Sequence, residues 1–334
     1  MAMLKAQYEI RGPVPQDVIH AVPFTPPPLT SSQALVAVLA APINPSDVLM
    51  LTGAYGILPP LPAIGGSEGV GRVVELAPDS SDLGVGLRVG QTVVLPAGSG
   101  TWATHVVVEA KRLVPLPDRA DAQQLSMLTV NPATAALMLS EFVALHPGDW
   151  VIQNVANSGV GGYLVQLARL RGLRTVNVVR RESAIASVQA QGGDVVLVDG
   201  DDLPQRVKAA ISGAPVRLGI DAVGGAATNR IARCLAEGGT LVNYGSMSGE
   251  ASVISAQSFI FNDITLRGFW LAKWFTKASR DTQRALYGEL AQRIADGQLS
   301  VPVHATYPVE QIRDAVRAAN TGERDGKILI VPKA

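Results

Sequence analysis

The spacing of hydrophobic positions changes near residue 122. Before this point, short apolar runs such as Ala34–Leu39, Gly69–Glu75 and Gln91–Leu95 alternate with turns rich in proline and glycine. Consecutive prolines, as in Pro26–Pro28, cannot continue a strand or a helix. The pattern predicts a compact barrel of short strands over residues 1–121.

From residue 122 onward, helical and strand patterns alternate. A helical segment covers Asn131–Leu139, with Asn131 placed as its cap and Pro132 in its first turn. Strand and helix patterns in alternation predict a doubly wound parallel sheet, and therefore an α/β fold. The predicted strands begin at Val151 and then cover Leu173–Val179, Asp194–Val198, Leu218–Val223, Thr240–Tyr244 and Ile264–Gly268.

The last part of the chain contains one helical pattern and one strand. Ser279–Asp296 is amphipathic, with Leu286, Leu290 and Ile294 on one face. The apolar run Lys327–Val331 predicts a final strand that returns to the first domain. The chain is therefore divided into residues 1–121, 122–270 and 271–334.

A strand, a glycine-rich turn and a helix follow one another over residues 151–170. Gly159 and Gly161 fit the pattern G-x-G-x-x-G, but Leu164 stands where its third glycine belongs. Such a turn brings a phosphate to backbone N–H groups at the positive end of a helix dipole. It predicts dinucleotide binding, with an ordinary tight connection as the alternative.

The strand after the glycine turn ends in two arginines. A site for NAD would place an acid here to bind the ribose 2′-hydroxyl, but Arg180 and Arg181 occupy these positions. Guanidinium groups suit a 2′-phosphate, so the expected cofactor is NADPH. Either arginine could hold the phosphate, and the alternative is that both are only solvated.

Composition excludes several classes of protein. Of 334 residues, 47% are hydrophobic and 17% are charged, and the formal net charge is zero, which argues against nucleic-acid binding. No apolar run is long enough for a membrane span, and no targeting segment is evident. The single cysteine, Cys234, allows no disulfide framework and fits a reducing compartment. We expect a cytoplasmic protein.

Several motifs, taken in order, resemble those of the medium-chain dehydrogenase/reductase superfamily. Within it, the chain is similar to the mitochondrial-type trans-2-enoyl-thioester reductases. The resemblance implies a GroES-like β-barrel catalytic domain, an inserted Rossmann domain for NADPH, a cleft between them and a homodimer joined through the cofactor domain. The motifs are Asn44–Asp47, Gly53–Gly56, Gly98–Trp102, Asn131–Ala135, Gln153–Gly161, Asn177–Arg180 and Arg267–Leu271.

Zinc-dependent members of the superfamily carry a Cys…Gly-His-Glu…Cys pattern. This chain has Gly66-Ser67-Glu68, and no cysteine precedes Cys234. Its four histidines have no ligand spacing. We therefore expect no catalytic zinc and no other metal.

The resemblance assigns the central catalytic role to Tyr55. An enoyl reductase adds a hydride to C3 and must stabilise the enolate oxygen with a hydrogen-bond donor. Tyr55 lies between glycines in a loop and matches the family tyrosine; a packed aromatic is the alternative. Asn44 could orient cofactor or substrate, or only form a turn. Trp270 could line the acyl pocket, or belong to a dimer interface.

The motif matches also imply a set of cofactor contacts. These residues lie in the glycine turn, at the ends of the predicted strands and in the final strand. They are Asn131, Asn157, Ser158, Gly159, Val160, Arg180, Arg181, Tyr244, Gly245, Ser246, Met247, Phe269, Trp270, Leu271 and Lys327.

The expected function is NADPH-dependent reduction of the carbon–carbon double bond of a trans-2-enoyl thioester of coenzyme A or of acyl carrier protein. A quinone or enone reductase of the same superfamily is the first alternative. An NADPH-binding protein with a non-catalytic role is the second. The sequence leaves acyl-chain length, carrier preference and the proton donor to C2 open.

Overall fold

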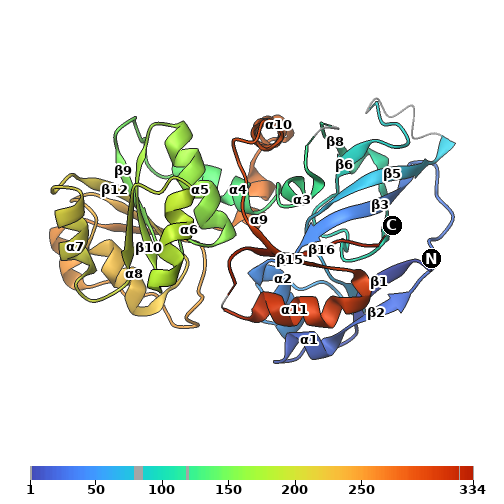
Figure 1. Ribbon diagram of the computed structural model, residues 1–334, viewed down its shortest axis with the longest axis horizontal. Coiled ribbons are helices and arrows are strands. Elements are labelled where there is room, and N and C mark those ends of the chain that lie inside the picture. Colours follow the sequence, from blue (N-terminus) through green and yellow to red (C-terminus); the bar gives the residue numbers. More distant parts are fainter. Residues whose placement is uncertain (1, 79–85, 118–119, 323, 334) are drawn as a thin grey trace. The chain divides into compact units, whose positions relative to one another are not determined.

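The computed structural model describes residues 2–78, 86–117, 120–322 and 324–333. The chain divides into two compact units (Figure 1). Unit 1 consists of residues 1–130 and 287–334, and unit 2 of residues 131–286. The chain therefore passes between the units twice, after Val130 and after Leu286.

Unit 1 is built mainly of antiparallel strands. Among the described residues, one sheet has the order β2-β1-β4 and the other has the order β15-β16-β3-β5-β6-β8, with β7 also paired to β3. The strands are β1 (Leu4–Tyr8), β2 (Ile19–Pro23), β3 (Gln33–Pro42), β4 (Ala63–Ile64), β5 (Val70–Leu76), β6 (Thr92–Val94), β7 (His105–Glu109), β8 (Val114–Pro115), β15 (Val303–Tyr307) and β16 (Lys327–Ile330).

The core of unit 1 forms around Trp102, which is fully buried. Its indole N–H donates to the carbonyl oxygen of Pro42 at 3.1 Å. A Cβ on Gly65 would lie 2.2 Å from the Trp102 ring, so this position requires glycine. The helices of unit 1 are α1 (Pro15–Val18), α2 (Pro45–Thr52), α3 (Ala122–Leu125) and α11 (Ile312–Asn320), with short helical turns η2 (Ala110–Arg112) and η5 (Val309–Gln311).

Unit 2 contains a parallel sheet whose order among the described residues is β11-β10-β9-β12-β13-β14. Its strands are β9 (Trp150–Gln153), β10 (Arg174–Val179), β11 (Val195–Val198), β12 (Val216–Asp221), β13 (Thr240–Asn243) and β14 (Thr265–Gly268). Its helical segments are α4 (Asn131–Ser140), α5 (Gly159–Leu170), η3 (Glu182–Ala184), α6 (Ile185–Ala190), α7 (Leu203–Ala210), α8 (Gly225–Ala232), η4 (Gln257–Phe261) and α9 (Leu271–Lys277). Helix α10 (Arg280–Ala295) runs from unit 2 into unit 1.

The strand order of unit 2 reverses between β9 and β12. From β9 the chain proceeds to β10 and β11 on one side, and then returns to β12 on the other. Such a reversal leaves a crevice at the carboxyl ends of the two strands, where open α/β sheets bind their ligands. The segments after β9 and after β12 therefore define the first place to look for a site.

The predicted fold class is confirmed, and the differences concern element ends. Strand β12 ends at Asp221 rather than Val223, because the N–H of Ala222 is bound by the Asn154 side chain. Helix α4 begins at Asn131, the residue expected to cap it. The final strand pairs with β3 and so returns to unit 1.

The limits of the two units also differ from the predicted boundaries, which lay after residues 121 and 270. Helix α3 stays with unit 1, where Gln124 exchanges two hydrogen bonds of 3.0 Å with the backbone of Val301.

Within the part of the chain that the structure describes, no helix is both long enough and apolar enough to span a bilayer.

Candidate functional site

The predicted glycine turn lies between β9 and α5. The Ser158 hydroxyl caps α5 by accepting the N–H of Gly161 at 3.1 Å. The first N–H groups of a helix have no partner within it, so those of Gly159 and Val160 suit an anion. A Cβ on Gly161 would lie 2.4 Å from the carbonyl oxygen of Ala156, so only glycine lets the helix start this close to the turn.

The structure brings two of the predicted cofactor residues together in unit 2. The hydroxyl of Tyr244, just after β13, hydrogen-bonds the side chain of Ser158 in the glycine turn. Burial raises the pKa of Tyr244 above its ordinary value, so its phenol stays neutral and keeps its proton for hydrogen bonding. The N–H of Tyr244 donates to the carbonyl oxygen of Asp221 at 2.9 Å. The ends of β9, β12 and β13 are thereby joined.

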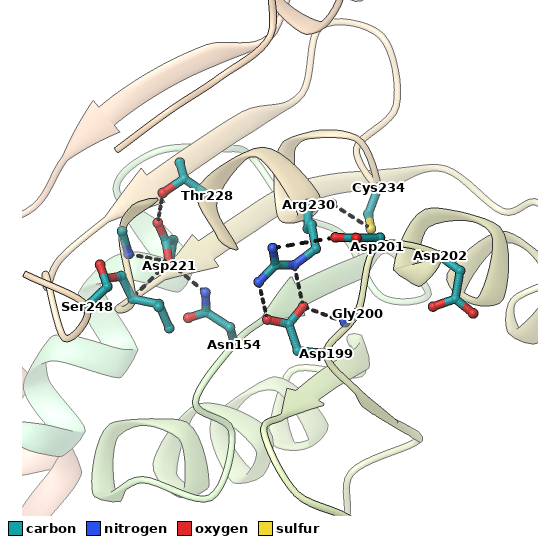
Figure 2. Close-up of polar contacts among 12 residues, drawn as sticks. Asn154, Asp199, Gly200, Asp201, Asp202, Asp221, Thr228, Arg230, Cys234 and Ser248 are labelled. Atoms are coloured by element: carbon teal, nitrogen blue, oxygen red, sulfur yellow. Dashed lines mark hydrogen bonds and ion pairs between the residues drawn. The ribbon is translucent and has the colours of Figure 1, made fainter. Parts of the chain in front are cut away.

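A buried carboxylate, Asp221, stands at the point where the strand order reverses. The side chain of Asn154, at the end of β9, donates to it at 2.6 Å across this point (Figure 2). Asn154 also accepts the N–H of Ala222 at 2.8 Å. Thr228 and Asn243 donate to the second oxygen of Asp221 at 2.6 and 2.9 Å. The carboxylate is held entirely by neutral donors from three elements.

The two arginines predicted to select NADPH follow β10. Arg180 is exposed, and Arg181 is half-buried at the start of η3. At the end of the neighbouring strand β11, Asp199 is bound by Arg230 through two hydrogen bonds of 2.7 and 2.6 Å, as Figure 2 shows. The charge of Asp199 is thus balanced by the bidentate contact with the Arg230 guanidinium.

The other predicted residues of unit 2 lie on or next to its strand ends. Asn131 is buried at the first position of α4. The ring of Phe269 packs edge-on against Phe142, with centroids 6.0 Å apart. Trp270 is 39% exposed. Asn157, Gly245 and Leu271 are half-buried, and Ser246 and Met247 are exposed.

Helix α2 of unit 1 positions the predicted catalytic tyrosine. Asp47 accepts the N–H of Asn44 at 2.8 Å and so fixes the start of the helix. Gly53 ends it in the left-handed conformation, with φ of 83°. Tyr55 follows two residues later in the loop and is half-buried.

Glu68 in unit 1 is fully buried. One of its oxygens accepts the amide of Asn44 at 2.7 Å. The other accepts the N–H and the hydroxyl of Thr129, at 3.1 and 2.9 Å, and the N–H of Val130 at 2.9 Å. Glu68 therefore holds the segment at which the chain leaves unit 1.

Asn44 and Lys327, both predicted site residues, belong to the same buried network. The Lys327 ammonium donates to the side-chain oxygen of Asn44 at 2.5 Å and to the carbonyl oxygen of Ile43 at 3.3 Å. Asn44 thus links the cation to Glu68, a role beyond that of a turn residue. Two acids, Glu68 and Asp47, share this neighbourhood with one lysine.

Burial dominates the electrostatics of the network. It raises the pKa of Glu68 to about 7, although the hydrogen bond from Asn44 and the charge of Lys327 act in the opposite direction. Burial also raises the pKa of Asp47 and lowers that of Lys327 to about 8. Both Glu68 and Lys327 therefore titrate close to neutral pH.

Ser67, which stands in the Gly66-Ser67-Glu68 segment compared above with the zinc-binding pattern, supports the start of α2. The hydroxyl of Ser67 donates to Asp47 at 2.5 Å. Across the described ranges, no three His, Cys, Asp or Glu side chains gather as a set of metal ligands.

Sequence reasoning did not single out Asn154, Asp221, Thr129 or the buried role of Glu68. Asn154 directly follows β9 and Asp221 is the last residue of β12, and the carboxyl ends of parallel strands meet at one edge. That signal was present in the sequence. The contacts of Thr129 with Glu68 join residues that are far apart in the chain and leave no local pattern.

The raised pKa of Glu68 predicts a pH dependence of stability. Between pH 5 and 7 the native protein keeps a proton on Glu68 that the unfolded chain has released. The contribution of Glu68 to the free energy of unfolding is therefore present at low pH and is lost as pH rises through 7, which gives this free energy a downward slope with pH. Glu68→Gln should remove this slope, worth at most roughly 3 kcal/mol. Urea denaturation at pH 5, 6 and 7 measures it.

The difference in slope between the wild-type protein and Glu68→Gln reports the titration of Glu68 alone. Lys327 stays protonated in both states below pH 7, and Asp47 contributes equally to both proteins. The exposed Glu75→Gln is the matched control and should keep the wild-type slope. An unchanged slope in Glu68→Gln would contradict the assignment.

Comparison with known proteins places the chain in a family. Residues 30–118 match the alcohol dehydrogenase GroES-like domain, and residues 159–287 match the zinc-binding dehydrogenase family. The mitochondrial enoyl-[acyl-carrier-protein] reductase of Rattus norvegicus is 40% identical over 294 residues, which cover 86% of this chain and 78% of the relative.

Three solved structures are similar to this protein over nearly the whole chain. A putative NADPH:quinone reductase from Bacillus thuringiensis is 27% identical, with a TM-score of 0.88 and full coverage of both chains. Etr1p in complex with NADP and crotonyl-CoA is 25% identical, with a TM-score of 0.87. The Etr1p/Etr2p heterodimer of Candida tropicalis, a mitochondrial 2-enoyl thioester reductase, is 26% identical, with a TM-score of 0.88. Both Etr1p alignments cover 99% of this chain and 100% of the other.

The two family models together match residues 30–118 and 159–287, and the relative aligns over most of its own length. The predicted resemblance is thereby confirmed. The chain belongs to the medium-chain dehydrogenase/reductase superfamily of oxidoreductases, among the relatives of the mitochondrial enoyl-[acyl-carrier-protein] reductases.

Proposed function

We propose that this protein is an NADPH-dependent reductase of the carbon–carbon double bond of trans-2-enoyl thioesters. The observation that carries the proposal is the 40% identity to an enoyl-[acyl-carrier-protein] reductase over 86% of the chain. The proposed substrate is an acyl thioester of coenzyme A or acyl carrier protein.

Features of unit 2 fit NADPH. Gly161 leaves room for the close approach of turn and helix that the pyrophosphate site needs. The N–H groups of Gly159 and Val160 at the start of α5 suit the pyrophosphate, and Arg180 or Arg181 suits the 2′-phosphate. The related Etr1p binds NADP in its complex with crotonyl-CoA.

When bound, NADPH supplies the hydride that adds to C3 of the substrate. The chain must then stabilise negative charge on the thioester oxygen, and Tyr55 is the proposed donor. Its phenol O–H can donate a hydrogen bond to that oxygen. Glu68 and Asp47 support it from a distance by fixing Asn44 at the start of α2, the helix that leads into the Tyr55 loop.

The remaining contacts predicted from the motifs form part of this proposal. Asn131, Tyr244–Met247 and Phe269–Leu271 would contact the cofactor in unit 2, and Lys327 in unit 1. Trp270 has the exposed surface that an acyl contact needs, at 39%. The proposed chemistry needs no metal, because Tyr55 takes the role of the Lewis acid at the oxygen.

We further propose a homodimer joined through unit 2. Strand β14 is the edge of the parallel sheet, and three of its four residues are exposed. Phe259, Ile260 and Phe261 in η4 are 46%, 70% and 75% exposed. An edge strand beside exposed apolar side chains is typical of an interface between copies. The related Etr1p forms a heterodimer with Etr2p.

The compartment remains a prediction. The relative from Rattus norvegicus is named as a mitochondrial enzyme, whereas the sequence as a whole predicts the cytoplasm. Localisation of the tagged full-length protein would distinguish the two.

A quinone reductase is the second candidate function. It is favoured by the structural similarity to a putative NADPH:quinone reductase, with a TM-score of 0.88. Turnover of quinones with none of enoyl thioesters would support it. NADPH binding without turnover of either class would support a non-catalytic role instead.

Tyr55→Phe tests the proposed donor. Loss of one oxyanion donor should lower kcat with crotonyl-CoA by about 100- to 1,000-fold while the Kd for NADPH stays unchanged. The rate is followed as the loss of nicotinamide absorbance. Tyr307→Phe, a half-buried tyrosine of the same unit, is the control and should keep wild-type kcat. Wild-type turnover by Tyr55→Phe would remove Tyr55 from the mechanism.

Arg180→Ala and Arg181→Ala test cofactor selection. The arginine that binds the 2′-phosphate should raise the Kd for NADPH about 10- to 100-fold when removed, because a charge-assisted bidentate contact is lost. The Kd for NADH should change little. Arg206→Ala, which breaks only an ion pair with Asp202, is the control. An unchanged NADPH-to-NADH ratio in both single variants and the double variant would contradict this assignment.

The pair of substitutions Ile260→Asp and Phe261→Asp tests the dimer. Placing two charges in an apolar interface should convert a dimer into a monomer, measured by light scattering coupled to gel filtration. Ile10→Asp introduces a charge at a 65% exposed isoleucine of unit 1 and should leave the mass unchanged. A wild-type protein that is monomeric at micromolar concentration would refute the proposal.

A further inference from the structure

The residue that enters the glycine turn has a strained backbone. Val155 adopts φ of 51°, in the left-handed region that β-branched residues avoid. It lies between the end of β9 and Ala156. Such a conformation persists only where the surrounding structure enforces it, and it is often found at functional sites.

The neighbours of Val155 are fixed to different strands. The N–H of Asn154 donates to the carbonyl oxygen of Ile220 in β12 at 3.1 Å. The N–H of Ala156 donates to the carbonyl oxygen of Val178 in β10 at 3.2 Å. The chain therefore passes from one flanking strand to the other within a single residue. The left-handed turn at Val155 makes this possible.

The side chain of Asn154 locks the first of these attachments. Its amide donates to Asp221 at 2.6 Å and its oxygen accepts the N–H of Ala222 at 2.8 Å. Figure 2 shows this side chain directed at the Asp221 carboxylate. Asp221 is itself immobilised by Thr228, Asn243 and the N–H of Val223, the last at 2.8 Å. Asn154 is thus bonded to a buried anchor that does not belong to the turn.

We propose that Asn154 is a positioning residue for cofactor binding: through Asp221 it holds Val155 in the left-handed conformation and so presets the glycine turn for the pyrophosphate. The inference rests on the proposed function only in taking NADPH as the ligand. The turn and the start of α5 approach each other closely, since a Cβ added at Gly161 would lie 2.4 Å from the carbonyl oxygen of Ala156.

The affinity for NADPH depends on the fraction of molecules in which the glycine turn already has the conformation that binds the pyrophosphate, here called the competent turn. Without the Asn154 side chain, Val155 relaxes toward negative φ, and the fraction of molecules with a preset turn falls. The apparent Kd rises in inverse proportion to that fraction. Glycine occupies positive φ about as readily as negative φ, so Val155→Gly should restore most of the competent population.

The test is a double-mutant cycle on NADPH binding, measured by calorimetry without substrate. Asn154→Ala should raise the Kd about tenfold or more, the size expected when a charge-assisted hydrogen bond is lost. Val155→Gly alone should change the Kd by less than about threefold, because glycine tolerates the same φ. The double variant should recover most of the loss.

Thr175→Val is the matched control. It removes a buried hydroxyl that donates to Asp194 at 3.2 Å near the start of β10, and it leaves Asp221 and the glycine turn untouched. It should lower Tm while the Kd for NADPH stays within about twofold, as expected for a residue that contacts neither the turn nor its anchor. An equal rise in Kd for Thr175→Val would show that general weakening of the unit, and not the turn, determines affinity, and would overturn the inference.

Asp221→Asn provides a second route if Asn154→Ala does not fold. It keeps the shape of the anchor but removes its charge, and its loss of NADPH affinity should likewise be rescued by Val155→Gly. Wild-type affinity in Asn154→Ala, or no rescue by glycine, would overturn the positioning role alone. A wild-type protein that does not bind NADPH would overturn both this inference and the proposed function. Binding of NADPH without enoyl reduction would overturn only the function.

Discussion

A carboxylate withdrawn from water is costly unless hydrogen-bond donors surround it, and this constraint shapes both units of the chain. Glu68 in unit 1 gathers donors from Asn44 and from the segment at Thr129 and Val130. Asp221 in unit 2 gathers donors from Asn154, Thr228 and Asn243. In each case one buried acid joins elements that are distant in sequence.

The two acids are satisfied in different ways. Asp221 is surrounded by neutral donors and forms a fixed anchor at the reversal of strand order. Glu68 is linked through Asn44 to Lys327, and burial brings the pKa of both groups close to neutral pH. The first arrangement suits a site that must keep its shape. The second couples the structure around α2 to proton uptake.

The proposed chemistry is divided between the units in a way that matches these networks. Unit 2 offers the glycine turn and exposed arginine for a dinucleotide, and its anchor supports the turn. Unit 1 offers Tyr55 on a loop whose preceding helix is fixed by Asp47. Ser67, which the sequence resemblance sets against the histidine of the zinc-binding pattern, donates to the same Asp47 and so supports the start of α2.

The sequence by itself determined the fold class, the parallel sheet, the glycine turn and the return of the final strand, because these depend on local periodicity and turn chemistry. It also predicted that Ser158 and Tyr244 contact the cofactor, but it gave no sign of the hydrogen bond between them. Only the tertiary structure decided the partners of Glu68, Asp221 and Lys327, because those contacts join residues far apart in the chain. The left-handed Val155 likewise had no local signal, since valine disfavours that conformation and only its anchored neighbours impose it.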